Sequence, residues 1–208
     1  MNNTWNKLIY KLWSPIYDRF FNTGYFLAAR KKVFQETAFT RKQKILFVGI
    51  GTGADLELIN HAELDITAID FSPDMLKKAK MKYPNSSIRF LEMDAQDMKF
   101  ENNHFDRVVG SLILSVVPDA DSCFREMARV LKPGGEMILF DKFLPKEKEP
   151  SLFKKSIRPA IRLLGTDIGL NFEELFEKNK TDFLIKENST VMFHGMYRKI
   201  LLSKRNPS

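Results

Sequence analysis

The residues best placed for chemistry in this sequence are a cluster of glycines and one acidic side chain that follows them. Gly49, Gly51 and Gly53 end an apolar run. With Ala54 in the place of a third glycine, the spacing satisfies the dinucleotide-binding pattern G-x-G-x-x-G/A. Glycines let a ligand approach backbone N–H groups near a helix N-terminus, and Asp70, 19 residues after Gly51, suits a ribose diol. The segment therefore predicts a site for a nucleoside-containing cofactor.

The elements that must position these residues alternate between short β-rich runs and helical patterns, which predicts βαβ units and a parallel sheet. Ser72 and Pro73 form a helix start, with Ser as N-cap and Pro at the first helical position. We expect strands at 44–49, 65–70, 88–92, 105–111 and 136–141, helices at 54–60, 121–131 and 172–179, a turn at 132–135, and a final hairpin of 183–192 with 197–202.

Composition excludes several classes of protein. The chain has 208 residues, of which 44% are hydrophobic and 28% charged, as in a single folded domain. Cys123 is the only cysteine, so a disulfide framework is excluded, and His61, His104 and His194 show no metal-ligand spacing. The longest uncharged run, 108–118, is too short to span a membrane. We expect a cytoplasmic protein without a metal.

Charge is distributed unevenly along the chain. Residues 1–44 carry 9 basic and 2 acidic side chains, residues 45–141 carry 10 and 16, and residues 142–208 carry 14 and 8. An acidic middle between basic flanks indicates two surfaces with different partners, although each flank also fits a solvated surface without a partner. No base-reading or single-strand-binding motif is visible, so nucleic acid is not an expected partner.

The N-terminal flank has apolar residues at helical spacing from Trp5 to Phe21, interrupted by Pro15. This stripe predicts a lid over the cofactor cleft, or a lid that also contacts an anionic membrane surface. We expect one domain over 1–208, divided into four parts. They are the N-terminal helical lid (1–43), the cofactor-binding core (44–141), a substrate-side insertion (142–170), and the last helix with the hairpin (171–208).

Four blocks of the core resemble the class I S-adenosylmethionine-dependent methyltransferases. They are ILFVGIGTGADL (45–56), ITAIDFSPDML (66–76), FLEMDAQDMKF (90–100), and FDRVVGSLILSVVPD with LKPGGEMILFD (105–119 and 131–141). The resemblance implies an α/β, Rossmann-like, mostly parallel seven-stranded sheet with helices on both faces and a C-terminal antiparallel hairpin. It also implies S-adenosylmethionine as cofactor.

The resemblance assigns roles to particular residues. The loop of Gly49, Gly51 and Gly53 would lie against the methionine part of the cofactor, and Asp70 would hold the ribose hydroxyls. The remaining contacts would be Phe71 on the adenine, Asp94 with the backbone of Ala95 at the adenine amino group, and Ser111 and Leu112 near the methyl group.

One position departs from the family pattern. The family usually has an acidic residue two positions before the first glycine, and this chain has Phe47 there. We interpret Phe47 as a tolerated variation, because the other carboxylates remain. The alternative is a non-catalytic lipid-surface protein that has lost the cofactor.

The block YKLWSPIYDRFF (10–21) resembles a branch that contains bacterial phospholipid N-methyltransferases and quinone C-methyltransferases. In that branch a tyrosine covers the cofactor or substrate, a role that falls on Tyr17, with Tyr10 and Tyr25 as further substrate-side candidates. We predict methylation of a lipid-like or amphipathic small molecule, with phosphatidylethanolamine nitrogen as the preferred acceptor and peripheral contact with the inner face of the membrane. A quinone or other small metabolite is the alternative acceptor, and an NAD(P)-dependent oxidoreductase is the alternative class of enzyme.

Overall fold

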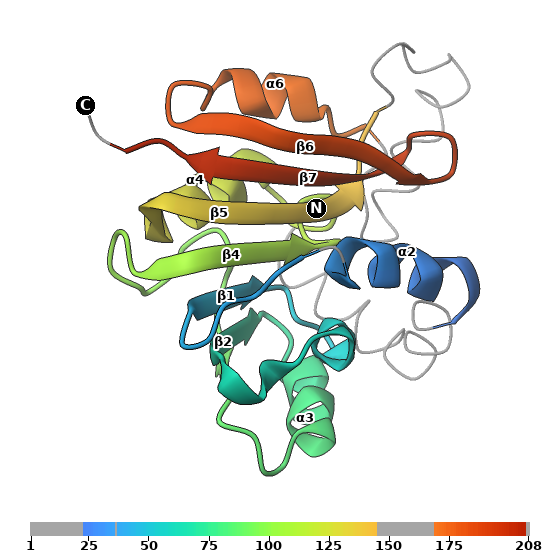
Figure 1. The fold of residues 1–208 in the computed structure, drawn as a ribbon, viewed down its shortest axis with the longest axis vertical. Helices are drawn as coiled ribbons and strands as arrows, with labels where there is room; N and C mark the ends of the chain where they lie inside the picture. The colour runs from blue at the N-terminus through green and yellow to red at the C-terminus, as the bar shows by residue number, and fades with distance from the viewer. Residues whose placement is uncertain (1–22, 36, 145–168, 207–208) are drawn as a thin grey trace.

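The computed structural model of the chain describes residues 23–35, 37–144 and 169–206, and within them one sheet holds seven strands (Figure 1). The spatial order is β3-β2-β1-β4-β5-β7-β6. Neighbours among the first five strands run parallel, whereas β7 is antiparallel to both β5 and β6. The strands are β1 (Lys44–Val48), β2 (Asp65–Asp70), β3 (Arg89–Glu92), β4 (Phe105–Ser111), β5 (Leu131–Lys142), β6 (Phe183–Met192) and β7 (Tyr197–Lys204). The predicted mostly parallel sheet with a C-terminal hairpin is confirmed.

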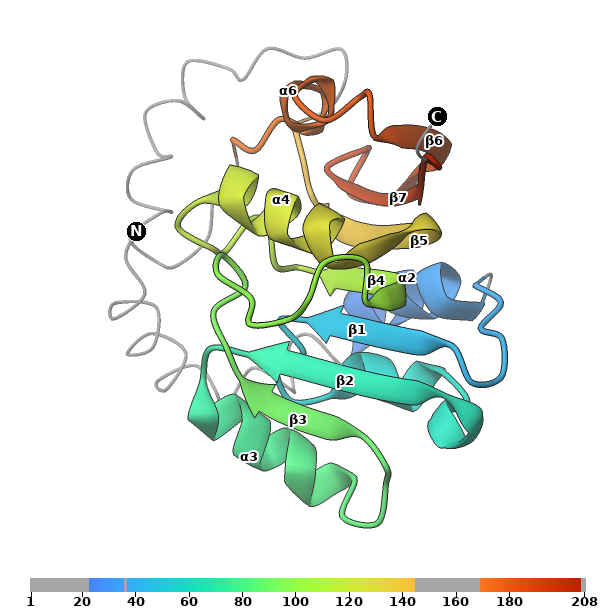
Figure 2. The same ribbon diagram turned by 90° about the vertical axis from the view of Figure 1, so that its left-hand side faces the viewer.

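Helices cover both faces of the sheet, as predicted (Figure 2). One face packs against α4 (Ala120–Val130) and α6 (Phe172–Glu177), and the other packs against α2 (Gly24–Gln35) and α3 (Pro73–Lys82). Two short 3₁₀ helices, η1 (Ala54–Leu58) and η2 (His61–Glu63), connect β1 to β2.

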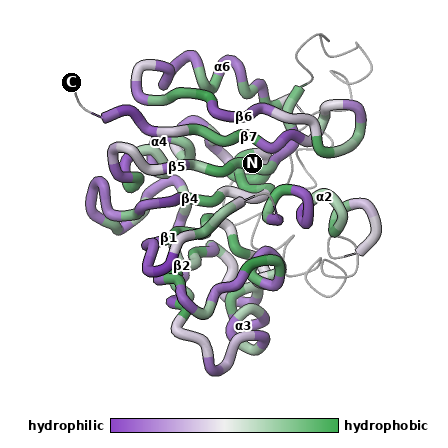
Figure 3. Tube along the Cα trace, viewed as in Figure 1, coloured by the Kyte–Doolittle hydropathy of each residue, from purple (hydrophilic) through white to green (hydrophobic). Residues whose placement is uncertain are grey.

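Successive side chains of the central strands belong alternately to two hydrophobic cores, one on each face of the sheet. On β1, Leu46 and Val48 belong to the core beneath α4 and α6. Ile45 and Phe47 belong to the core beneath α2, because successive strand residues point to opposite faces. Hydrophobic residues gather along these central strands (Figure 3). The two-sided burial explains why these strands are apolar runs rather than alternating ones.

Local signals in the sequence place most element boundaries. Ser72 caps α3, with its hydroxyl accepting a hydrogen bond from the Met75 N–H at 3.3 Å, and Pro73 is the first helical residue. The strand predicted at 105–111 is observed as β4, and the hairpin and the helix at 121–131 are shifted by only a few residues.

Two expectations about local structure need correction. The helix expected at 54–60 is the 3₁₀ helix η1, which begins after Gly53 in the left-handed conformation and ends before the extended Ile59. Five residues leave room for little more than one turn, and 3₁₀ geometry is common in such short pieces. The turn expected at 132–135 lies inside β5, where Gly134 has a φ of 73° and the pairing with β4 shifts register.

The two flanks are described only in part. In the N-terminal flank, residues 24–35 form α2, whereas Tyr10 and Tyr17 lie outside the described residues. Most of the expected insertion at 142–170 also lies outside them. Among the described residues, no helix combines the length and the apolar character needed to cross a bilayer.

Candidate active site

The glycine loop after β1 begins the site, and each of its three glycines has a positive φ, between 57° and 79°. A Cβ added to Gly49 would lie 2.5 Å from Ile113 Cδ1, so that position excludes a side chain. A Cβ on Gly51 would meet nothing within 4 Å, because Gly51 faces open space. Gly53 instead packs against Tyr83, whose hydroxyl donates to the Gly53 carbonyl at 2.9 Å. Gly49 and Gly51 therefore line the site, whereas Gly53 lies on the side of the loop that packs against Tyr83.

Asp70 joins the end of β2 to the glycine loop. Its Oδ2 accepts a hydrogen bond from the Gly51 N–H and its Oδ1 from the Ser72 N–H, both at 2.8 Å. Burial raises the pKa of Asp70, while the backbone N–H groups of Ser72, Gly51 and Phe71 oppose the rise. Each carboxylate oxygen keeps lone-pair capacity for another donor. Asp70 can therefore accept hydrogen bonds from a ligand without giving up its own anchors.

A second acidic residue, Asp94, follows β3 and is held by a residue that the sequence analysis did not identify. Asp94 Oδ1 accepts hydrogen bonds from both the backbone N–H and the side-chain Nε2 of Gln96, each at 2.9 Å. Gln96 Oε1 in turn accepts from the Asp119 N–H at 2.9 Å. Gln96 thus connects Asp94 to the loop that follows β4. Only the Asp-x-Gln spacing hints at the first contact, and nothing local indicates the second.

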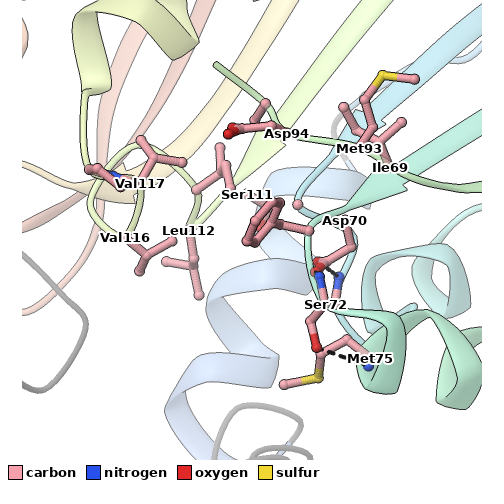
Figure 4. Close-up of a pocket in the computed structure, with 16 residues that line it drawn as sticks. Ile69, Asp70, Ser72, Met75, Met93, Asp94, Ser111, Leu112, Val116 and Val117 are labelled. Carbon is pink, nitrogen blue, oxygen red and sulfur yellow. Dashed lines mark hydrogen bonds between the residues drawn. The ribbon is translucent and has the colours of Figure 1, made fainter. Parts of the chain in front are cut away.

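Gly49, Gly51, Asp70 and Asp94 line one cavity at the carboxyl ends of the strands (Figure 4). Asp70, Ser72 and Met75 lie on one side of it, with Leu112, Val116 and Val117 on the other (Figure 4). Eight of the residues predicted to bind a cofactor line this cavity: Gly49, Gly51, Asp70, Phe71, Asp94, Ala95, Ser111 and Leu112. The rest of the lining, most of it apolar, was not predicted from the sequence: Ile69, Ser72, Met75, Met93, Ile113, Val116, Val117 and Pro118.

Three predicted positions do not belong to the described cavity. Gly53 is behind the loop, and Tyr25, on α2, has 81% of its surface exposed and does not line the cavity. Phe47 is 1% exposed and packs on the α2 side of the sheet, with its ring centroid 6.4 Å from that of Phe34. An aromatic core contact thus occupies the position where the family usually has an acid.

The lining of the cavity suits a nucleoside sulfonium, because it combines hydrogen-bond acceptors with an apolar wall. Two carboxylates, Asp70 and Asp94, suit hydroxyl and amino donors and a positive charge, while the apolar wall suits a flat base and a methyl group. The space beside Gly51 lets a ligand touch the backbone at a point that any side chain would block. Among the described residues, no cluster of histidine, cysteine and acidic side chains has the form of a metal site.

Known proteins with similar sequences and structures agree with this chemistry. A family profile described as a methyltransferase domain matches residues 46–139. Phosphatidylethanolamine N-methyltransferase of Cereibacter sphaeroides is 34% identical over 160 residues, covering 75% of this chain and 77% of the relative. Demethylmenaquinone methyltransferase of Staphylococcus aureus is 30% identical over 174 residues, covering 80% of this chain and 68% of the relative.

A solved structure extends the similarity to the fold. It is a chain from the complex between the Haloferax volcanii Trm112 methyltransferase activator and a methyltransferase, with a TM-score of 0.78. The match covers 97% of this chain and 98% of that chain at 14% sequence identity, so it concerns the fold alone.

The chain belongs to the class I S-adenosylmethionine-dependent methyltransferases. It is an enzyme of that class, with S-adenosylmethionine as methyl donor. The family, fold and cofactor predicted from the sequence are confirmed, and the oxidoreductase and non-catalytic interpretations are set aside.

Proposed function

We propose that this enzyme methylates a lipid-like or amphipathic small molecule, with the nitrogen of phosphatidylethanolamine as acceptor. The observation that carries the proposal is the similarity to the phosphatidylethanolamine N-methyltransferase, at 34% identity over 77% of that protein. The composition of the chain agrees with it, because the cavity lies in the acidic middle third, and the flanks are basic. A basic surface favours an anionic membrane, where such an acceptor resides.

We also propose how the cavity holds S-adenosylmethionine. The backbone at Gly49 and Gly51 lies against the methionine part, and Asp70 accepts from the ribose hydroxyls. Asp94 accepts from the adenine amino group beside the Ala95 backbone, and Phe71 packs on the ring. Ser111 and Leu112 line the far side near the methyl group. Support comes from the position of all eight residues around one cavity.

When bound, S-adenosylmethionine supplies a methyl group on a sulfonium sulfur that is already activated for in-line displacement. The residues of this chain then have to align the acceptor and exclude water. Leu112, Ile113 and Val116 supply an apolar wall on one side of the cavity. An ammonium acceptor must lose its proton before it attacks. Tyr17 remains the candidate to assist, and it lies outside the described residues.

The N-terminal flank is proposed as a lid that also contacts the membrane, which would make the protein cytoplasmic and peripheral on the inner face. Deleting residues 1–21 should reduce co-sedimentation with vesicles that contain anionic lipid, because it removes the apolar stripe together with Lys7, Lys11 and Arg19. Vesicles of neutral phosphatidylcholine are the control. Equal sedimentation of the full and shortened chains with anionic vesicles would leave the segment as a lid only.

The acceptor is tested by incubating the full chain with S-adenosylmethionine labelled in the methyl group and with vesicles of phosphatidylethanolamine or phosphatidylglycerol. Label in the phosphatidylethanolamine fraction alone is the expected result. Asp70→Ala serves as the control with a damaged cavity and should lose the label. The absence of label from phosphatidylethanolamine, with an active enzyme on another acceptor, would overturn this choice of substrate.

A quinone ring is the second candidate acceptor, favoured by the 30% identity to demethylmenaquinone methyltransferase. The same assay with a reduced demethylated quinone in the vesicles separates the two candidates. Label that appears in the quinone and not in the phospholipid would transfer the proposal to this second substrate class.

A further inference from the structure

One wall of the cavity is a loop rather than a regular element. Leu112, Ile113, Val116, Val117 and Pro118 line the cavity directly after the end of β4. The N–H groups of Val116 and Val117 both bond to the Ile113 carbonyl at 3.1 Å, which folds the segment into a compact turn. Leu112 has a φ of 57°, a conformation that costs a residue with a side chain about 1–2 kcal/mol. A turn that contains such a residue needs an anchor elsewhere in the structure.

The end of β5 supplies this anchor through two consecutive residues. The Leu112 N–H donates to the Phe140 carbonyl at 2.7 Å. The Ser115 N–H donates to Asp141 Oδ2 at 3.2 Å, and Asp141 Oδ1 accepts from the Lys142 N–H at 2.7 Å. Asp141 and Ser115 are 0% and 1% exposed. The wall is therefore held from beneath by a carboxylate that does not itself line the cavity.

Burying the carboxylate of Asp141 costs free energy. Burial raises the pKa of Asp141, and the hydrogen bonds from Ser115 and from the Lys142 backbone offset only part of that effect. An acid in this position therefore weakens the core compared with an apolar residue of the same size. What the acid provides, and an apolar residue would not, is a fixed acceptor for the Ser115 N–H.

We propose that Asp141 is a positioning residue for the cofactor site: by holding Ser115 it fixes the wall of residues 112–118 that lines the cavity. The inference rests on the proposed placement of S-adenosylmethionine in the cavity. Asp141 touches neither cofactor nor acceptor in this scheme, and it acts through the loop.

Asp106 provides a control on the same sheet, away from the cavity. Its Oδ2 accepts a hydrogen bond from the Lys44 N–H at 2.8 Å, so it too is a β-strand aspartate that anchors a backbone N–H of another segment. Asp106 lies near the start of β4, at the opposite ends of the strands from the cavity, and does not line the cavity. A purely structural role for Asp141 predicts that substitutions at either position leave the Kd for S-adenosylmethionine and the exchange of 112–118 unchanged.

The test compares Asp141→Asn and Asp141→Ala with Asp106→Asn and Asp106→Ala in the full chain. The readouts are the melting temperature, the Kd for S-adenosylmethionine by calorimetry, and amide hydrogen exchange of the segment 112–118. Asn keeps one of the two acceptor oxygens, and Ala keeps neither. We expect Kd to rise at least about fivefold for Asp141→Asn and more for Asp141→Ala, as expected for loss of a buried hydrogen bond. Exchange of 112–118 should accelerate, while the Asp106 variants change Kd less than about twofold.

The results for the Asp70, Asp141 and Asp106 variants test the role of Asp141 separately from the proposed S-adenosylmethionine site. If Asp70→Ala weakens binding but the Asp141 and Asp106 variants behave alike in affinity and exchange, the positioning role of Asp141 is wrong and the site stands. If Asp70→Ala leaves S-adenosylmethionine binding unchanged, the proposed cofactor site is wrong, and the role of Asp141 that rests on it is wrong too. Where Asp141→Ala does not fold, Asp141→Asn decides. Slow exchange of the Ser115 amide in the wild type, slowed further by S-adenosylmethionine, supports the role, and rapid exchange with and without it overturns it.

Discussion

Charged residues have different partners at the two ends of the parallel strands. At the amino ends, opposite charges are paired: Lys132 Nζ lies 2.6 Å from Asp106 Oδ1, and Arg107 pairs with Glu136. At the carboxyl ends, Asp70 and Asp141 accept hydrogen bonds from backbone N–H groups instead. The first arrangement joins strands. The second holds one carboxylate, Asp70, at the cavity and uses the other, Asp141, to anchor a loop of the cavity wall.

The pKa directions express the same difference. Burial raises the pKa of Asp106, but hydrogen bonds and charge from Lys132 and Lys44 outweigh that effect, so its pKa is lowered overall. For Asp70 and Asp141, burial dominates and the pKa is raised. Of these two carboxylates, only Asp70 lines the cavity, where it can accept hydrogen bonds from a ligand. The comparison predicts that substitutions at the amino ends change stability and that those at the carboxyl ends change binding.

The largest expected effect is on stability at the amino ends. Arg107→Met should lower the free energy of unfolding by about 2–3 kcal/mol, because it removes a charged hydrogen-bond donor from a mostly buried cluster. The Arg107 side chain is 9% exposed, donates to the Ala38 carbonyl at 2.6 Å, and lies 5.1 Å from the Phe39 ring centroid. Urea denaturation measures the loss. The Kd for S-adenosylmethionine should stay unchanged, and a comparable loss of affinity would break the division between the two ends.

Asp70→Ala should weaken S-adenosylmethionine binding by about 1.5–3 kcal/mol, typical of hydrogen bonds to a charged group. Asp65→Ala is the control at the other end of the same strand, since the Asp65 side chain forms an exposed ion pair with Arg89 at 3.0 Å. Calorimetry on both variants gives the difference in affinity. Equal affinities for the two variants would contradict the placement of the ribose at Asp70.

Two glycines with positive φ sharpen the comparison. Gly51→Ala and Gly134→Ala should each lower the free energy of unfolding by about 1–2 kcal/mol, because both positions need a left-handed backbone. Only Gly51→Ala should also weaken cofactor binding, because its new Cβ enters the open space of the cavity. A Cβ at Gly134 would instead approach Asn206 Oδ1 at 3.3 Å. Thermal unfolding with and without S-adenosylmethionine separates the effect on stability from the effect on binding. Equal ligand-induced stabilisation of both variants would contradict the prediction that only Gly51→Ala weakens binding.

The smallest expected effect is a pH dependence at the amino ends. The folded-state pKa of Asp106 lies below its ordinary value of 3.8, so the folded protein binds this proton less tightly than the unfolded chain does. Its stabilising contribution is therefore complete above that ordinary value and is lost as pH falls through the folded-state pKa. Asp106→Asn should lack this contribution, about 0.5–1 kcal/mol for a partly exposed pair. Urea denaturation at several acidic pH values should show the gap between wild type and variant closing as pH falls, and a gap that widens would reverse the assignment.

The strands, the capped start of α3 and the glycine loop could be predicted because each depends on residues close together in the sequence. Ser72 needs only Pro73 and Met75 to cap a helix, and Gly49 and Gly51 need only their own backbone conformation. The resemblance to the methyltransferases then indicated eight residues that do line the cavity.

The parts that could not be predicted depend on contacts between distant segments. Gln96 reaches Asp119, and Asp141 reaches Ser115, across 23 and 26 residues. Gly53 looks like its neighbouring glycines in the sequence, but Tyr83, 30 residues away, covers it. No local pattern records such pairs.

The sequence by itself determined which segments form the central strands, where α3 begins, and which carboxylate follows the glycine loop, because hydrophobic periodicity and backbone preference act over a few residues. Only the tertiary structure decided which glycine faces the cavity, which side of the sheet Phe47 occupies, and which loop Asp141 holds. Those outcomes follow from packing the strands side by side, which brings separate chain segments within hydrogen-bond distance at the ends of the sheet.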